Sequence, residues 1–268
     1  MGKGGVMANG AQTSIINAAL TAWQDALAAR QRMPNLFLIA IGVVAVLNLA
    51  YIGLVVVGFW IGPGLLAFIV GLIYAVAQGF LLTPLAIAVH RFLLLGEVSD
   101  RYRLDTQDPR FMRFFTFLAG LAVVMFIPKL VGELFSSPLG PSGIGRLIGL
   151  VLSIAAAVVL VRTVILFPAV AVDAPGAEWQ NAMADTKGHS WRVFFILLCA
   201  ILPPAIIVAI LLMIFFFIPV IGWIIAVAIQ AAFGVFVVAA TAAAASRLYI
   251  DYAQQLGRPA GVASQSAA

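Results

Sequence analysis

The residue types that usually carry chemistry are few in this chain and widely spaced. Its 268 residues include two histidines, His90 and His189, and a single cysteine. No His-Glu-x-x-His, Gly-x-Ser-x-Gly or glycine-rich phosphate-loop motif occurs, and one cysteine cannot form an intramolecular disulfide or a cysteine zinc site. Asp100, Asp105 and Asp108 offer ligands for a divalent cation together with His90, but arginines separate them, which favours a solvated loop. The sequence therefore predicts a protein that is not an enzyme, with no cofactor and no metal site.

The composition indicates a membrane protein. Hydrophobic residues make up 64% of the chain and charged residues 9%, whereas soluble domains carry about 25% charged residues and roughly 45–50% apolar ones. So little polar material cannot cover a globular core with a hydrated surface. The same composition excludes a disordered chain and a fibrous repeat, because apolar residues dominate without a collagen-like period.

Apolar runs long enough to cross a bilayer occur six times. A membrane helix needs about 20 such residues, and the runs are continuous rather than alternating, which argues against barrel strands. Short connections with Gly and Pro alternate with long polar ones. We therefore predict an all-α membrane bundle of six transmembrane helices arranged as three hairpins, at Leu36–Trp60, Gly64–Val89, Phe114–Phe135, Arg146–Val172, Val193–Ile218 and Val220–Ser246.

Positive charge predicts the orientation of these helices. Of the 15 Lys and Arg residues, only Lys129 and Arg146 fall on the side of the short connections. Positively charged loops stay in the cytoplasm, so we expect both termini and the long connections there. The charge is spread over loops rather than collected in a groove with aromatic platforms, so we expect no nucleic-acid partner.

The segment before the first span is predicted to form an amphipathic helix. Ile16, Leu20, Trp23 and Leu27 recur on one stripe, and polar residues occupy the opposite face. Such a helix lies flat on the inner leaflet or, as the alternative, binds a partner helix. The predicted organisation is a disordered tail over 1–12, this interfacial helix over 13–32, a six-span membrane domain over 33–250 and a cytoplasmic tail over 251–268.

Prolines inside the apolar runs predict bends or breaks. Pro203 and Pro204 lie near the middle of the fifth span, and Pro84 and Pro168 lie in the second and fourth. A proline has no N–H to donate, and its ring clashes with the preceding turn.

Polar side chains inside the apolar runs are the remaining candidates for function. Arg162 is the clearest, because apolar residues precede and follow it. If Arg162 lies near the midplane, its insertion costs about 2.5–3.5 kcal/mol and demands a partner or a water-filled pocket. Gln78, His90 and Gln230 are the partners in range by depth. Alternatively, the span ends at Val161, a short interfacial helix follows, and Arg162 reaches lipid phosphate.

Two stretches of the C-terminal part resemble a known family. Arg162 is followed by Pro168 and Asp173, and the end of the sixth predicted span carries Leu248-Tyr249-Ile250-Asp251. These motifs, with the turn Thr186-Lys-Gly-His-Ser-Trp191-Arg192, are similar to those of the membrane domain associated with glycerophosphoryl diester phosphodiesterases and of small proteobacterial inner-membrane proteins. The resemblance implies six to eight membrane helices in a bacterial inner membrane. The diesterase chemistry of that family resides in a separate soluble barrel whose residues this chain lacks, so it does not carry over.

Several side chains near the predicted inner surface have the chemistry to contact lipid headgroups. They are Arg113, Trp179, Lys187, Trp191 and Arg192. We therefore predict an integral inner-membrane protein that is a structural or accessory component of lipid or envelope processes. Its expected partners are membrane lipids and either another membrane protein or a second copy of the chain.

A transporter is the alternative function. In that case a small transporter or channel has its pathway near Arg162, Gln230 and the Pro203-Pro204 break. A continuous polar cavity that reaches Arg162 favours transport, whereas a dry bundle favours the accessory role.

Overall fold

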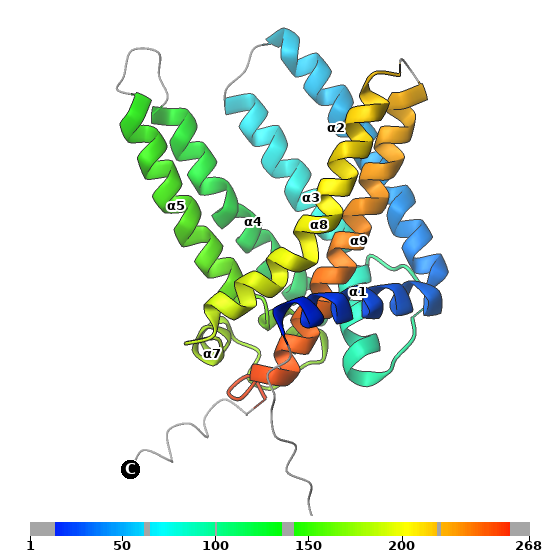
Figure 1. Cartoon of the computed structure of the whole chain (residues 1–268), viewed down its shortest axis with the longest axis vertical. Coiled ribbons are helices and arrows are strands. Elements are labelled where there is room, and N and C mark those ends of the chain that lie inside the picture. The colour runs from blue at the N-terminus through cyan, green and yellow to red at the C-terminus, as the bar shows by residue number, and fades with distance from the viewer. Residues whose placement is uncertain (1–13, 62–64, 100, 136–141, 219–220, 258–268) are drawn as a thin grey trace, which may run out of the picture.

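The computed structural model describes residues 14–61, 65–99, 101–135, 142–218 and 221–257 (Figure 1). The tail predicted over 1–12 and most of the one predicted over 251–268 lie outside them. Within the described residues the regular structure is helical, without strands. The helices are α1 (Ile15–Arg32), α2 (Pro34–Ile61), α3 (Leu65–Leu95), α4 (Pro109–Phe135), α5 (Ser142–Thr163), α6 (Leu166–Ala171), α7 (Trp179–Asp185), α8 (Ser190–Phe216) and α9 (Ile221–Tyr252).

Five of these helices are long and apolar enough to cross a membrane. The described apolar stretch of α5, Leu147–Thr163, is shorter. The prediction of an all-helical protein with several helices that can span a membrane is therefore confirmed. The five stretches are Pro34–Val55 in α2, Phe68–Leu95 in α3, Pro109–Gly132 in α4, Ser190–Phe215 in α8 and Ile221–Tyr252 in α9.

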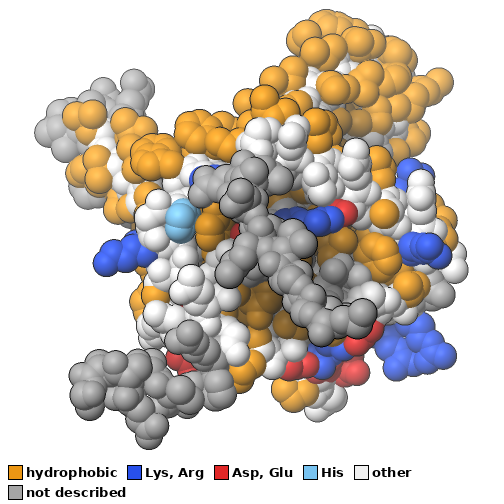
Figure 2. Space-filling model, turned by 60° about the horizontal axis from the view of Figure 1, so that its bottom comes forward, with side chains coloured by type: hydrophobic (Ala, Val, Ile, Leu, Met, Phe, Trp, Pro, Cys, Tyr) orange, Lys and Arg blue, Asp and Glu red, His pale blue; other side chains and the backbone are white. Residues whose placement is uncertain are grey.

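The long helices pack mainly with their neighbours in the chain. α2 packs on α3, α4 on α5, and α8 on α9, while α9 also contacts α2 and α3. In Figure 1 the α4–α5 pair leans away from the other long helices toward the top of the view. The short helices α6 and α7 lie at the lower end of α5, the end we call the charged end. Figure 2 turns this end forward and shows Lys, Arg, Asp and Glu side chains on it.

The fourth apolar run, predicted as one span over Arg146–Val172, is not one continuous helix. The alternative, a helix that ends near Val161 and is followed by a short one, is closer to the structure. α5 ends at Thr163, and the separate helix α6 begins at Leu166. Pro168 explains the interruption, because it has no N–H to donate to the carbonyl of Val164. Most side chains of α6 are buried against α3, α4 and α9, so α6 is part of the core and not a helix on the membrane surface.

The other prolines stay inside their helices. Pro84 lies within α3, and Pro203 and Pro204 lie within α8. Figure 1 shows α8 changing direction partway along its length, as expected for a proline kink. The structure thus shows a bend and not a break at this pair.

Helix α1 lies across α8 and α9 near the charged end (Figure 1). Its N-cap Ser14 accepts a hydrogen bond from the Asn17 amide at 3.2 Å. The face packed on the bundle consists of four buried alanines at helical spacing: Ala19, Ala22, Ala26 and Ala29. Small side chains let two helix backbones approach closely. The large apolar residues of the predicted stripe, Ile16, Leu20 and Leu27, remain exposed, so their contact with lipid stays a prediction.

Trp23 joins α1 to the proline kink of α8. Its indole Nε1 donates a hydrogen bond to the Ala200 carbonyl at 2.7 Å, across 177 residues of chain. In a regular helix the amide four residues later would donate to this carbonyl, but that residue is Pro204. A second tie is polar: the Arg247 guanidinium of α9 binds both carboxylate oxygens of Asp25, at 2.8 and 3.0 Å. α1 is therefore a fixed part of the bundle.

The connection between α3 and α4 is held in a similar way. The Tyr102 hydroxyl donates to the Leu81 carbonyl at 2.6 Å, three residues before Pro84 of α3. Burial raises the pKa of Tyr102. This phenol is therefore a neutral donor that anchors the connection to the helix.

We predict that Trp23→Phe destabilises the protein. Phenylalanine keeps most of the ring but leaves the Ala200 carbonyl without a donor, and an unsatisfied buried polar group costs about 1–3 kcal/mol. Unfolding in mixed detergent micelles measures the change. Trp179→Phe is the matched control, because Trp179 is 51% exposed on α7. Equal stability of the two variants would contradict the role of the indole.

Candidate functional site

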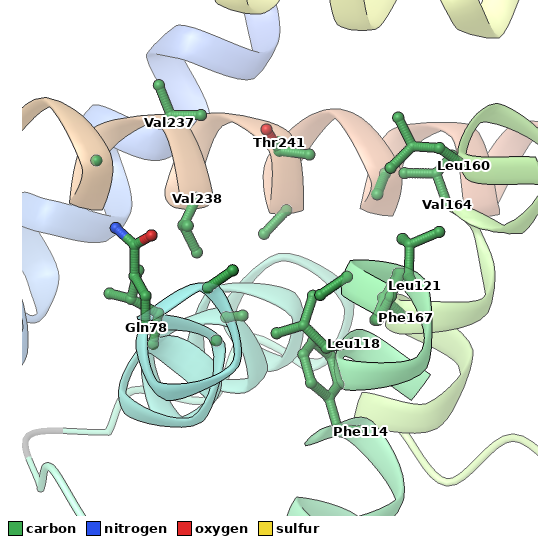
Figure 3. Close-up of a pocket in the computed structure, with 18 of the residues that line it drawn as sticks. Gln78, Phe114, Leu118, Leu121, Leu160, Val164, Phe167, Val237, Val238 and Thr241 are labelled. Atoms are coloured by element: carbon green, nitrogen blue, oxygen red, sulfur yellow. The ribbon is translucent and has the colours of Figure 1, made fainter. Parts of the chain in front are cut away.

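A cavity of about 440 Å³ lies among α3, α4, α9 and the junction of α5 with α6. We call it the apolar cavity, because carbon-rich side chains form nearly all of its wall. Figure 3 shows Leu118 and Leu121 of α4 facing Val238 of α9 across it. Three polar side chains also line it, Gln78, His90 and Thr241. A volume of this order suits a small apolar ligand, since ligand pockets span about 300–1,000 Å³.

Small residues on facing helices create this space. Ala75, Gly79 and Ala86 line the cavity from α3, and Gly234 and Ala242 line it from α9. The two glycines leave little room for a larger side chain: a Cβ at Gly79 would lie 3.1 Å from Leu118 Cδ2, and one at Gly234 would lie 3.6 Å from Gln78 Nε2. α4 packs on α3 and α5, while α9 packs on α1, α2, α3 and α8, so the cavity separates the α4–α5 pair from α9.

A polar pair and an aromatic cluster close the cavity toward the charged end. His90 is 2% exposed, and its Nδ1 lies 2.8 Å from the Ser246 hydroxyl of α9. The His90 ring contacts Phe114, with 5.9 Å between ring centroids, and Phe114 contacts Phe167 at 5.1 Å. His90 and Ser246 thus satisfy each other across α3 and α9, as expected for an interhelical hydrogen bond in a membrane protein.

The four predicted polar candidates do not come together. Gln78 and His90 both line the apolar cavity, whereas Gln230 is exposed on α9. Arg162 lies in the last turn of α5, at the charged end. Its carbonyl lies 3.0 Å from the Thr186 hydroxyl, and its Nε is buried without a hydrogen-bond partner among the described residues. Arg162 does not line the apolar cavity.

The predicted headgroup residues differ in their surroundings. Trp179, Lys187 and Trp191 are exposed, Trp191 by 75%. Arg192 is half-buried. The Arg113 guanidinium donates to the Ala177 carbonyl and so holds the segment after α6. Contact of these side chains with headgroups stays a prediction.

The sequence analysis missed an ion-pair cluster at the charged end. Arg91 binds both carboxylate oxygens of Glu97 at 2.7 Å and donates to the Ala171 carbonyl at 3.0 Å. Arg110 binds Asp173 in a bidentate pair with its Nε 2.9 and 3.0 Å from the two oxygens. Together these pairs join α3, α4 and the end of α6.

Backbone conformation positions two of these carboxylates. Asp173 has a φ of +54°, a left-handed conformation that Asp and Asn tolerate better than most residues. Gly96 has a φ of +71° and turns the chain after α3 back toward Arg91. Arg91, Glu97 and Arg110 also line a second cavity of about 390 Å³, the charged cleft, which Arg162 and Gln230 do not line.

Comparison with known proteins gives no match, whether with family models, curated proteins or solved structures. The family resemblance of the C-terminal motifs therefore stays a prediction.

We predict that Glu97 titrates below the ordinary glutamate value of 4.5. The Arg91 hydrogen bonds stabilise the carboxylate and lower the Glu97 pKa, and nearby charge from Arg91 and Arg110 acts in the same direction. Because the folded-state pKa is depressed, the stabilisation is present above the unfolded pKa and is lost as pH falls through the folded pKa. NMR titration of labelled glutamate carboxyls in micelles measures the midpoint.

The variant Arg91→Gln should raise the Glu97 midpoint toward 4.5. Lys187→Gln removes one exposed positive charge elsewhere and should leave the midpoint in place. A wild-type midpoint at or above 4.5 would refute the assignment.

Proposed function

We propose that this chain is a multi-pass membrane protein without catalytic chemistry that binds the acyl chain of a lipid in the apolar cavity. In this proposal α5 is a sixth span, the long helices form three hairpins, and both termini face the cytoplasm of a bacterial cell. The protein then serves lipid or envelope processes as a structural or accessory component. The observation that carries the proposal is the 440 Å³ cavity between helices that can span a membrane.

The composition of the cavity wall favours an acyl chain over water. Water needs two to four polar partners in a cavity, and the wall offers Gln78, Thr241 and a His90 already bonded to Ser246. An empty cavity would forfeit dispersion contacts along its whole wall. In a bilayer the protein is surrounded by lipid acyl chains. An acyl chain that enters between α9 and the α4–α5 pair makes dispersion contacts with the cavity wall and gives up no hydrogen bonds.

The position of the charged side chains supports the orientation. The Arg91–Glu97, Arg110–Asp173 and Arg247–Asp25 pairs lie at the ends of spans, and Figure 2 shows charged groups on the face that includes the charged end. Positively charged segments are retained in the cytoplasm, which makes the charged end the inner one.

The transport alternative lacks support from the two cavities. A pathway through Arg162, Gln230 and Pro203-Pro204 would place these residues on a polar wall, but they line neither the apolar cavity nor the charged cleft. The accessory role therefore fits the structure better.

A bulky residue in the cavity should exclude the chain. We predict that Ala122→Trp lowers crosslinking to a phospholipid with a photoreactive acyl chain by about tenfold, because losing two methylene contacts of about 0.8 kcal/mol each corresponds to that factor. Peptide mapping of the wild-type adduct should place it on cavity residues such as Leu118 and Val238. Val123→Trp is the matched control, since Val123 is the next residue of α4 and is 46% exposed outside the cavity.

Equal crosslinking of the two tryptophan variants would refute acyl-chain binding in the cavity. A separate measurement tests the orientation: reporter fusions at the two termini should both be active in the cytoplasm, and a fusion that reports opposite sides for the two ends would refute the six-span arrangement.

A further inference from the structure

The charged cleft is a site separate from the apolar cavity. On α3 it is lined by Pro84, Ile87, Ala88 and Arg91, which lie about half a helical turn around the axis from the residues that face the apolar cavity. The cleft has one apolar wall, to which Phe111 of α4 also contributes. Apart from Val98 and Ser99, the rest of its lining is charged and comes from the ends of α3 and α4 and the connection between them.

Arginine and aspartate side chains share this cleft without neutralising each other. Arg91, Glu97 and Arg110 are engaged in the ion pairs described above. Among the described residues, the other four charged side chains of the cleft form no ion pair within 4.0 Å. These are Arg101, Arg103, Asp105 and Asp108.

The connection that carries these four residues is fixed in place. Tyr102 is anchored by its hydroxyl to the Leu81 carbonyl. Arg101 and Arg103, on either side of the anchored Tyr102, are exposed and line the cleft, which Tyr102 does not. The Ser99 amide adds a contact to the Met33 sulfur at 3.4 Å.

Hydrogen bonds also fix the two aspartates. Asp105 Oδ1 accepts from the Gln107 amide at 3.1 Å, and Asp108 Oδ1 accepts from the Arg110 amide at 2.9 Å, at the start of α4. Each carboxylate keeps lone pairs for a further donor. The cleft therefore presents two carboxylates held by backbone amides and two exposed guanidinium groups on an anchored connection.

We propose that the charged cleft binds a zwitterion with a phosphate and a primary ammonium group, as in an ethanolamine phospholipid. The guanidinium groups of Arg101 and Arg103 match phosphate oxygens, and the carboxylates of Asp105 and Asp108 accept from the ammonium. The apolar wall suits the carbon atoms next to the phosphate. This inference does not depend on acyl-chain binding in the apolar cavity.

Lipid selectivity tests the proposal. The full chain, purified in non-ionic detergent, is titrated with phosphatidylethanolamine, phosphatidylcholine and phosphatidylglycerol of identical acyl chains, and binding is read by native mass spectrometry. Phosphatidylethanolamine should bind about tenfold more tightly than the other two. Phosphatidylcholine has no N–H to donate, and phosphatidylglycerol has no cation.

Two double variants separate the two halves of the zwitterion. R101Q/R103Q should weaken phosphatidylethanolamine binding about tenfold. D105N/D108N keeps side-chain oxygens for the backbone amides and should remove the preference over phosphatidylglycerol. R30Q/R32Q removes two other exposed arginines, at the end of α1, and should leave the preference intact. Thermal unfolding of each variant separates lost binding from lost fold.

Competition with soluble phosphoethanolamine identifies the source of the ligand. Displacement of the lipid indicates a soluble phosphorylated amine as the ligand, whereas retention of the lipid indicates a membrane lipid, and both outcomes support the site. Equal binding of the three lipids by the wild type would overturn the proposal. Equal loss of binding in R101Q/R103Q and R30Q/R32Q would also overturn it.

Discussion

Backbone carbonyls that lose their helical donor dictate how the peripheral elements attach to this bundle. A bilayer offers no water to satisfy a freed carbonyl, so the protein has to supply the donor itself. At the kink of α8 the donor to the freed Ala200 carbonyl is the indole of Trp23. The phenol of Tyr102 likewise donates to a carbonyl of a long helix, that of Leu81, three residues before Pro84 of α3. Where α5 ends, the Thr186 hydroxyl lies 3.0 Å from the Arg162 carbonyl. Where α6 ends, Arg91 donates to the Ala171 carbonyl, and between α6 and α7 Arg113 donates to the Ala177 carbonyl.

The short elements at the charged end therefore share one structural role. α1, the α3–α4 connection and the segment around α7 each place a side-chain donor against a backbone carbonyl of a long helix. In return each is held in a fixed position, which an interfacial segment bound only by lipid would lack. The α3–α4 connection, which carries four charged residues of the charged cleft, is anchored in this way through Tyr102. The apolar cavity depends on small residues instead, since Gly79 and Gly234 leave room where larger side chains would meet.

The sequence predicts the parts of this fold that depend on composition and periodicity. Long apolar runs identify the helices that can cross a membrane, and apolar residues at helical spacing before them predict a helix where α1 forms. Proline positions locate the bends, but not whether a helix continues: Pro203 and Pro204 stay inside α8, whereas Pro168 lies in a separate helix. The difference depends on tertiary contacts, because α6 is buried on three neighbours and α8 receives a donor from α1.

The candidate site was less predictable for a related reason. Gln78 and His90 stand out as polar residues in apolar runs, and both line the apolar cavity. The cavity itself is defined by alanines and glycines of helices distant in sequence, which carry no local signal. The bidentate Arg110–Asp173 pair joins residues 63 positions apart, and the left-handed turns at Gly96 and Asp173 that make the ion pairs possible have no unique motif. Polar residues inside apolar runs could be identified as candidates from the sequence. Which side chains pair across the bundle could be seen only in the folded structure.

A double-mutant cycle between Trp23 and Pro204 tests the central role of the freed carbonyls most directly. Pro204→Ala restores a backbone N–H that can bond the Ala200 carbonyl, so the indole is then no longer required. We expect Trp23→Phe to lose more than half of its destabilising effect in the Pro204→Ala background. The same loss of unfolding free energy in both backgrounds would contradict it.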